Sequence, residues 1–508
     1  MKNYIDDMSP NFNARSLSGR LEVKAVLELT SPAHLGGVTS HSLSDHAILI
    51  DHQGRPYLPG TTLTGLLRHH MHKLMHNDHH KPLGVTELDD IADLFGSRWD
   101  VESDDQSSII VDDAFFDSDQ AVKTELRDGV AISCRTGSAI PGKKFDREWL
   151  AVGSRFYLSF ELLLCNDNEK CKNRLKWFSV LLQALEEEQV SVGARSSRGF
   201  GRCRAKDFAY RLFDTGSMTG MLQWLGAGGG LPDSWPNLEY KKAATVKDMF
   251  SELNKTLGMS TNELSTSRVP CLNVQIKMSC PGSMLIKSSM NQPDNADSIH
   301  IHRLHQNSSF VPVIPGTSMA GILRHRALKI SNTIAGESNR YLAEQLIDSL
   351  FGPEIKPGQG KVPKSSRIIV EEAVLQGEPE LINHARVMID RWQGGAFKHN
   401  LFDALVLFGS SVTIKWKVEN PLPADHELGL MLCLVKDLFT GNLLVGAETG
   451  VGRGVLYGIA ATVSIQGSSP HLIQLKGDAR GSLEIAESEK DVNPYFTALR
   501  NYLQGEAK

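Results

Sequence analysis

The chain has 508 residues, of which 41% are hydrophobic and 22% charged, as in ordinary globular proteins. Its formal net charge of −5 excludes a protein that binds nucleic acid with its whole surface, so any such binding must use local basic patches. The seven cysteines form no CxxC pair, which argues for a reducing compartment and against a thiolate zinc site. No apolar run is long enough to span a membrane and the N-terminus does not resemble a signal peptide, so we expect a cytoplasmic protein without a membrane partner.

The first predicted strand covers residues 21–29, where apolar side chains alternate with mostly polar neighbours. The turn SPAHLGG follows at 31–37, and a polar loop then leads to a hairpin over residues 47–58. The alternation predicts a half-buried strand at the start of an α+β unit.

A helix is predicted to begin in the stretch RPYLPGTTLTGLLR, residues 55–68. Thr61, after the Pro-Gly turn, is the expected N-cap, because its hydroxyl can accept from free N–H groups of the first turn. Leu63, Leu67 and Met71 fall on one face of this helix. Gly65 inside the helix suggests that something approaches the backbone closely there.

An LFG tripeptide follows at residues 94–96, and a strand that ends in Asp112-Asp113 follows at 107–114. Next come a basic segment at 135–147 and an edge-type strand at 156–164. After a helix, a glycine-rich loop occupies residues 192–203.

All these landmarks recur in the same order about 256 residues later, with Pro315 in the place of Pro59 and Leu350 in that of Leu94. The second series has Thr317 as the expected cap, and its loop is VGAETGVGRGVLYG, residues 445–458. Repetition in order at a nearly constant offset indicates a tandem duplication.

We therefore expect two domains with a linker between them. The expected ranges are 1–213 for the first domain, 214–268 for the linker, 269–465 for the second domain and 466–508 for a C-terminal extension with a helix near 494–503. The order of strands and helices in each half predicts a ferredoxin-like (RRM-like) α+β fold, with an antiparallel sheet and helices on one face.

The set of landmarks resembles the RAMP superfamily of CRISPR-associated proteins, most closely the repeated backbone subunits of type III effector complexes. The resemblance is carried by the AHLGG turn at 33–37, the SDH loop at 44–46, the Pro-Gly caps, LFG, the strand ending in acids, an R…D-R segment and the glycine-rich loop. It covers both halves, so the chain is similar to a fused double subunit with two RAMP domains and thumb-like insertions.

The resemblance implies that the chain binds guide RNA together with other CRISPR effector subunits, and that a thumb-like hairpin from each domain interrupts the pairing of guide and target RNA. It implies that Asp45 promotes cleavage of the target RNA with Mg²⁺ or Mn²⁺, as catalytic residue and metal ligand. Asp45 lies 14 positions before Pro59, whereas Asp297 lies 18 positions before Pro315 and competes with Asp294 for the same role. We therefore expect catalysis at Asp45 and consider Asp297 the candidate of the second domain.

The expected RNA-binding residues are basic side chains near helix starts and hairpins, the turn histidine, and glycines that let a phosphate approach the backbone. They are His34, Arg68, Arg135, Lys143, Lys144, Gly193, Arg195, Arg198, Gly199, Gly201, Arg324, Arg386, Arg391, Gly446, Gly452, Arg453 and Gly454. Arg147 belongs to the same basic segment, and Trp149 and Trp392 are available for stacking on bases.

Other readings stay open. Asp45 can be an ordinary loop acid, and the arginines can be solvated surface groups. His72 and His76 have metal-ligand spacing but lack an evident third ligand, so a solvated helix end is favoured. Besides target cleavage, the sequence is compatible with a non-catalytic guide-binding scaffold and with a guide-processing ribonuclease that uses His34. A tandem domain that binds small molecules is a more distant alternative.

Overall fold

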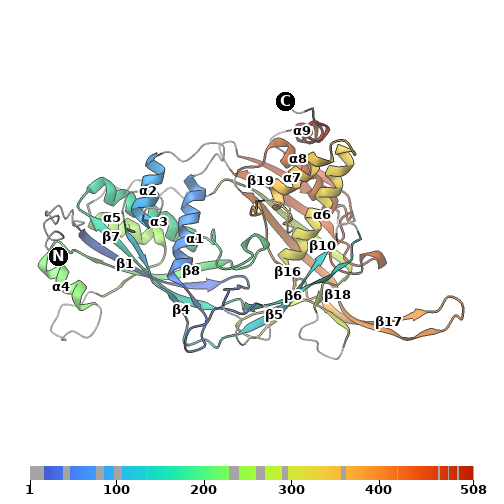
Figure 1. Ribbon diagram of the computed structural model, residues 1–508, viewed down its shortest axis with the longest axis horizontal. Coiled ribbons are helices and arrows are strands. Elements are labelled where there is room, and N and C mark those ends of the chain that lie inside the picture. The colour runs from blue at the N-terminus through green and yellow to red at the C-terminus, as the bar shows by residue number, and fades with distance from the viewer. Residues whose placement is uncertain are drawn as a thin grey trace, which may run out of the picture.

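The computed structural model describes residues 17–37, 46–75, 85–96, 106–133, 136–227, 239–258, 269–288, 296–355, 362–419, 421–466, 470–478, 480–488 and 491–506. Within these residues the chain forms two α+β units that lie side by side (Figure 1). No helix in the described part of the chain is long and apolar enough to cross a membrane.

The first domain is an antiparallel sheet with its helices on one face (Figure 1). Its strands are β1 (Leu17–Leu29), β2 (Tyr57–Leu58), β3 (Ile109–Val111), β4 (Ala114–Phe116), β7 (Arg155–Cys165) and β8 (Cys203–Phe213), and its helices are α1 (Gly60–Met75), α2 (Val85–Phe95) and α3 (Asn168–Glu186).

Sheet order in the first domain is β2-β4-β7-β1-β8-β9, where β9 covers Lys241–Ala243, and β3 is also paired to β7. The central strands β3-β7-β1-β8, with α1 after β1 and α3 after β7, have the ferredoxin-like arrangement that the sequence predicts. The expectation of an edge strand over 156–164 is wrong, because β7 pairs with β1 on one side and with β3 and β4 on the other.

The second domain repeats this plan. Its strands are β10 (Cys271–Met284), β11 (Lys287–Ser288), β12 (Ser298–His300), β13 (His302–Leu304), β14 (Phe310–Ile314), β15 (Ile368–Val370), β16 (Ala373–Gln376), β18 (Ala396–Glu419) and β19 (Tyr457–Gln466), and its helices are α6 (Gly316–Ala335), α7 (Arg340–Phe351) and α8 (Asp425–Phe439). The order β15-β18-β10-β19 matches β3-β7-β1-β8, which confirms a fold repeated in tandem.

Each domain carries one long β-hairpin at the place of its basic segment. The first consists of β5 (Thr124–Ile132) and β6 (Ala139–Leu150), which form a separate two-stranded sheet. The second consists of β17 (Glu380–Ile389) and the first part of β18, and it projects from the molecule (Figure 1). These hairpins are the thumb-like insertions that the resemblance implies.

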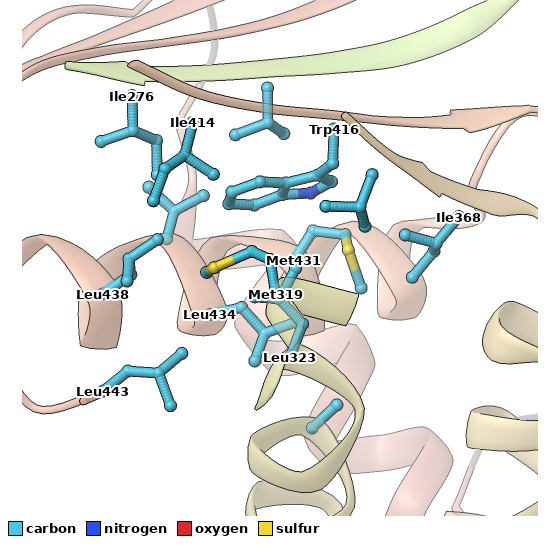
Figure 2. Close-up of a cluster of buried hydrophobic side chains, with 14 of the residues drawn as sticks. Ile276, Met319, Leu323, Ile368, Ile414, Trp416, Met431, Leu434, Leu438 and Leu443 are labelled. Carbon is cyan, nitrogen blue, oxygen red and sulfur yellow. The ribbon is translucent and has the colours of Figure 1, made fainter. Parts of the chain in front are cut away.

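The core of the second domain gathers around Trp416, which is 2% exposed and lies between the sheet and helices α6 and α8 (Figure 2). Met319 and Leu323 reach it from α6, and Met431 and Leu434 from α8. In the first domain the predicted face of α1 is likewise buried, through Leu63, Leu67 and Met71. Removal of these apolar side chains from water is the main term that holds each domain together.

The helices start two residues earlier than expected. Helices α1 and α6 begin at Gly60 and Gly316, so Thr61 and Thr317 lie inside the first turn and are not N-caps. The Asp113 carboxylate instead accepts the backbone N–H of Gly60 at 2.7 Å. A strand-end acid from elsewhere in the chain thus satisfies a free N–H group of the helix.

The segment between the domains and the C-terminal segment both pack on the domain that precedes them. The former contains α4 (Met218–Gly226), β9 (Lys241–Ala243) and α5 (Val246–Thr256), and α5 adds its apolar face to the first core. The latter contains β20 (His471–Lys476), β21 (Glu484–Ser488) and α9 (Asn493–Gln504), and it extends the second sheet beyond β19. Helix α9 confirms the helix expected near 494–503.

The two domains meet through a buried ionic group at the base of the first hairpin. Arg127, on β5, is 6% exposed and contacts Glu372 at 2.5 Å and Glu125 at 2.6 Å. Glu125 also accepts the backbone N–H of Leu304 at 2.6 Å. Because a buried guanidinium is costly without partners, this group ties the first hairpin to the second domain.

Candidate nucleic-acid interface

The glycine-rich loop of the first domain folds against the turn that follows β1. Gly193, Gly199 and Gly201 have φ of 79°, 80° and 73°, a region that favours glycine. A Cβ atom at Gly193 would overlap the carbonyl of His34, to which the Ala194 N–H donates at 3.0 Å. These glycines are therefore required by packing within the chain.

Next to this loop lie three arginines that we call the arginine cluster: Arg147, Arg195 and Arg198. Within the described part of the chain, none of the three has an acidic side chain in ion-pair distance. Arg195 lies 4.6 Å above the ring of Phe145. Burial lowers the pKa of all three arginines, and the charges of Arg147 and Arg198 lower that of Arg195 further. Partly buried cations that only repel one another are a ready site for an anion.

Arg324 extends this positive region into the second domain. Its charge, together with burial, lowers the pKa of Arg198. Arg324 also donates to the carbonyl of Gly352 at 2.7 Å and lies 3.5 Å from Asp348, so part of its role is to hold the turn after α7. Arg68 stands at the same position of α1 and is partly exposed.

Gly65 and Gly321, the repeated helix glycines, face open space. No atom of the described chain lies within 4 Å of a Cβ built at either position. Within the described residues, the close approach suggested by the sequence is therefore not made.

His34 is 4% exposed and its Nδ1 donates to the carbonyl of Glu148 at 2.8 Å. Burial lowers its pKa below the usual value, so the ring is neutral near pH 7. Trp149 is 3% exposed and stacks on Phe200 with 3.9 Å between ring centres. The expectation that Trp149 is available for stacking on bases is wrong, because Phe200 of the glycine loop already covers it.

The corresponding loop of the second domain has the opposite chemistry. Glu448, in the place of Arg195, contacts Arg386 at 2.7 Å, Arg453 at 3.2 Å and Lys287 at 3.0 Å. Burial would raise its pKa, but hydrogen bonds from Arg386 and Lys287 outweigh burial and lower it. Three cations of this domain thus already share an internal anion.

The glycines of the second loop repeat those of the first in conformation. Gly446, Gly452 and Gly454 have φ of 102°, 88° and 74°. A Cβ atom at Gly454 would overlap the carbonyl of Val445, whereas Gly452 faces open space.

The two hairpins present different surfaces. Lys143 and Lys144 are exposed on β6, and Lys144 lies 3.7 Å from Asp128. On the second hairpin Trp392 is 97% exposed, beside exposed Arg391. Arg135 lies outside the described residues.

A family model of the RAMP superfamily matches residues 26–204 and 260–457, which together make up more than half of the chain. The chain belongs to the RAMP superfamily. The two matched regions contain the two repeated folds, and membership supports a CRISPR-associated role that includes RNA binding. A search of curated proteins finds no match.

Strand pairing relates the two candidate aspartates of the RAMP regions. Asp45 lies outside the described residues, but His46, which follows it, pairs in parallel with Arg147 of the first hairpin. Asp297 directly precedes Ser298, which pairs in parallel with Ala404 of the second hairpin. Asp297 is therefore the positional counterpart of Asp45 despite its different distance from the Pro-Gly turn.

A second aspartate, Asp403, lies beside Asp297 and was not a candidate in the sequence analysis. Asp403 donates its backbone N–H to the Asp297 carboxylate at 3.0 Å. The Oδ1 atom of Asp403 is buried and accepts no hydrogen bond in the described part of the chain. Asp146 stands one residue before Arg147, as Asp403 stands one residue before Ala404, so the first RAMP region has the same acid. The R…D-R motif contains Asp146 in the first copy, but in the second copy its aspartate is Asp390, so the motif did not point to Asp403.

The described residues contain no group of three or more side chains suited to hold a metal ion. His72 lies on α1, while His76 and Asp294 lie outside the described residues.

Alignment of the two glycine loops in the sequence already shows the opposite charges of Arg195 and Glu448. The ion pairs that Glu448 forms could not be predicted from the sequence.

Proposed function

We propose that this RAMP protein is a guide-RNA-bound backbone subunit of a CRISPR type III effector complex, and that it cleaves complementary target RNA. Pairing between guide and target would select the RNA, while this chain would grip the backbone. Other effector subunits would be its protein partners.

The observation that carries the proposal is the arginine cluster. RNA phosphates are the anions that a site of guanidinium groups without acidic partners fits best. The cluster lies at the root of the first hairpin, where His46 pairs with Arg147. Guide or target phosphates bound there would therefore pass close to the chain segment that carries the early-loop aspartate.

Cleavage of RNA needs no protein nucleophile, because the 2′-hydroxyl can attack the adjacent phosphate once the backbone is bent in line. The exposed apolar and aromatic side chains of the second hairpin, above all Trp392, suit the unstacking of bases that such bending requires. Asp45 in the first domain and Asp297 in the second would accept the proton or hold the metal ion.

The residues around Asp297 fit Mg²⁺ or Mn²⁺. Both ions prefer oxygen ligands and are commonly held by one or two carboxylates. Asp297 and Asp403 would hold the ion in the second domain, and the buried Oδ1 of Asp403 supports this assignment. When bound, the ion would neutralise charge on the phosphate and help to activate the attacking oxygen.

The test uses the purified complex with its guide and an end-labelled complementary RNA, with Mg²⁺ or Mn²⁺. We expect two sets of cuts, one lost in Asp45→Ala and the other in Asp297→Ala. Asp51→Ala is a control, because Asp51 is a partly exposed acid of the neighbouring turn, and within the described residues its carboxylate accepts backbone N–H groups of that turn. If Asp45→Ala leaves every cut intact, the catalytic assignment is wrong.

A non-catalytic scaffold role for the second domain is the alternative that one observation favours. Its loop cations are occupied by Glu448, so this domain has less free positive charge for RNA. In that case Asp297→Ala would leave all products unchanged while Asp45→Ala still removes them.

A further inference from the structure

The first hairpin holds Arg195 through an aromatic ring. Phe145 stands on β6 of the hairpin and Arg195 in the glycine loop, and the guanidinium carbon of Arg195 lies 4.6 Å from the centre of the ring. The π face of a phenyl ring is negative, so it attracts a cation placed above it. The contact therefore joins the hairpin to the loop.

This contact holds Arg195 without neutralising it. Within the described part of the chain, the guanidinium of Arg195 forms no hydrogen bond and no ion pair. A carboxylate partner would occupy the N–H groups along the edge of the guanidinium, and these are the groups that bind a phosphate. An uncharged ring leaves the positive charge uncompensated, so Arg195 is held in place and can still bind an anion.

Gly129, on the opposite strand of the hairpin, makes room for the ring. It is paired with Phe145 in register, and a Cβ atom built at Gly129 would lie 2.3 Å from Cζ of the ring. The φ of Gly129 lies outside the left-handed region, so its backbone conformation does not require glycine. The ring that lies over this residue is therefore the reason for the missing side chain.

The second hairpin has the same phenylalanine in a different setting. The dipeptide Phe-Asp stands at residues 145–146 and at residues 402–403, in corresponding places of the two hairpins. Phe402 is paired with Arg386, and not with a glycine. Its ring is 46% exposed.

A carboxylate does in the second domain what the ring does in the first. Arg386 contacts Glu448 at 2.7 Å, and Glu448 stands at the loop position of Arg195. Each domain thus has one guanidinium between its hairpin and its loop, but the carboxylate neutralises its partner and the ring does not. The ring is the holder that suits a cation whose task is to bind phosphate.

We propose that Phe145 is the positioning residue of Arg195: its ring fixes the guanidinium at the root of the first hairpin, so that the cation is ordered before an RNA phosphate arrives. Gly129 serves the same end by leaving space for the ring. The inference rests on the proposed binding of RNA and adds to it a residue that carries no charge. Ordering in advance raises affinity, because the entropy of immobilising a long side chain is then not lost on binding.

The test measures the affinity of the full chain for fluorescein-labelled single-stranded RNA by anisotropy, at several salt concentrations. Phe145→Leu is expected to weaken binding by about threefold to tenfold, because Arg195 must then be ordered on binding. The slope of log affinity against log salt is expected to stay that of the parent, because no charge is removed. Phe145→Tyr, which keeps the ring, is expected to bind as the parent does.

Two further variants show whether Phe145 acts through Arg195. Arg195→Gln is expected to lower both the affinity and the salt slope, and adding Phe145→Leu to it should change neither any further. Gly129→Ala is expected to weaken binding as Phe145→Leu does, because the new Cβ displaces the ring while leaving it in the chain. Gly129→Ala also serves if Phe145→Leu disturbs folding, which unfolding midpoints in urea report.

Phe115→Leu is the matched control, since Phe115 is a 53% exposed ring on β4, in the main sheet of the first domain, and is expected to bind RNA as the parent does. The positioning role is overturned if Phe145→Leu and Gly129→Ala both bind as the parent does while Arg195→Gln binds more weakly. Equal weakening by Phe145→Leu in the parent and in Arg195→Gln also overturns it. Unchanged affinity and slope in Arg195→Gln would instead refute the RNA site on which the inference rests.

Discussion

Arg195 and Glu448 occupy the same position of the two glycine loops with the same backbone conformation, φ of 61° and 58°, but they carry opposite charges. Arg195 belongs to a cluster of cations, whereas Glu448 neutralises three cations of its own domain. The two loops thus have the same backbone conformation at this position but side chains of opposite charge. We therefore expect RNA phosphates to bind at the loop of the first domain.

Arg195→Glu is expected to weaken RNA binding by about tenfold and to reduce the slope of log affinity against log salt by about one, because one phosphate contact is lost. Fluorescence anisotropy with single-stranded RNA at several salt concentrations measures both quantities. The control is Lys476→Glu, which makes the same charge change at an exposed site on β20. Equal losses for the two variants would show that only net charge matters.

Glu448→Gln is expected to lower the free energy of unfolding by roughly 1–3 kcal/mol at neutral pH, because three cations lose their shared carboxylate. The pKa of Glu448 is lowered in the folded chain, so its stabilisation is present above the unfolded pKa and disappears as pH falls through the folded one. Urea unfolding from pH 7 downward should show the difference between variant and parent shrink in acid. A difference that stays constant with pH would contradict this.

Arg127→Met is expected to destabilise the chain by about 3–5 kcal/mol, because it leaves the buried carboxylates of Glu125 and Glu372 without their cation. Burial already raises the pKa of Glu125. Neutralising both acids in an Arg127→Met, Glu125→Gln, Glu372→Gln chain should recover most of the loss. Unfolding midpoints in urea compare the variants, and a triple variant no more stable than the single one would refute the account.

Gly199→Ala is expected to loosen the junction between the domains, because φ is 80° and the new Cβ would meet the backbone of Val370 and Glu372 at 2.7 Å. Gly54→Ala is the matched control, with φ of 76° and open space around the new atom. Both share a conformational cost of about 1–2 kcal/mol, so the excess loss in Gly199→Ala reports the clash. Hydrogen exchange over residues 368–372 should quicken in Gly199→Ala alone.

Local patterns predicted the repeated strands, the amphipathic face of α1 and the hairpins, because the periodicity of side chains reports which face is buried. Leu63, Leu67 and Met71 are all buried as expected. The same kind of reasoning misplaced the helix cap at Thr61, since the group that binds the first N–H is Asp113, far along the chain. Sheet order is also non-local, and the position of β7 inside the sheet was missed for this reason.

The sequence predicted which types of residue the candidate site contains, but not how these residues are arranged. The basic residues of the first loop do gather, yet Arg202, beside them, is engaged by Glu371 across the domain junction. Trp149 was expected at the surface, and only the fold shows that Phe200 covers it. Whether a cation forms an ion pair depends on acidic residues that are distant in the sequence. The spacing of residues along the chain therefore does not predict which cations are paired.

Strand β18 runs from the second hairpin into the centre of the sheet as one element of 24 residues, whereas the first hairpin is a sheet of its own. The chain bends within β18 at Gly409, where φ is 68°, and reaches Trp416 seven residues further on. The second hairpin is therefore joined by continuous backbone to Trp416, the residue around which the second core is packed (Figure 2). The first hairpin is instead fastened to the other domain, through the contact of Arg127 with Glu372.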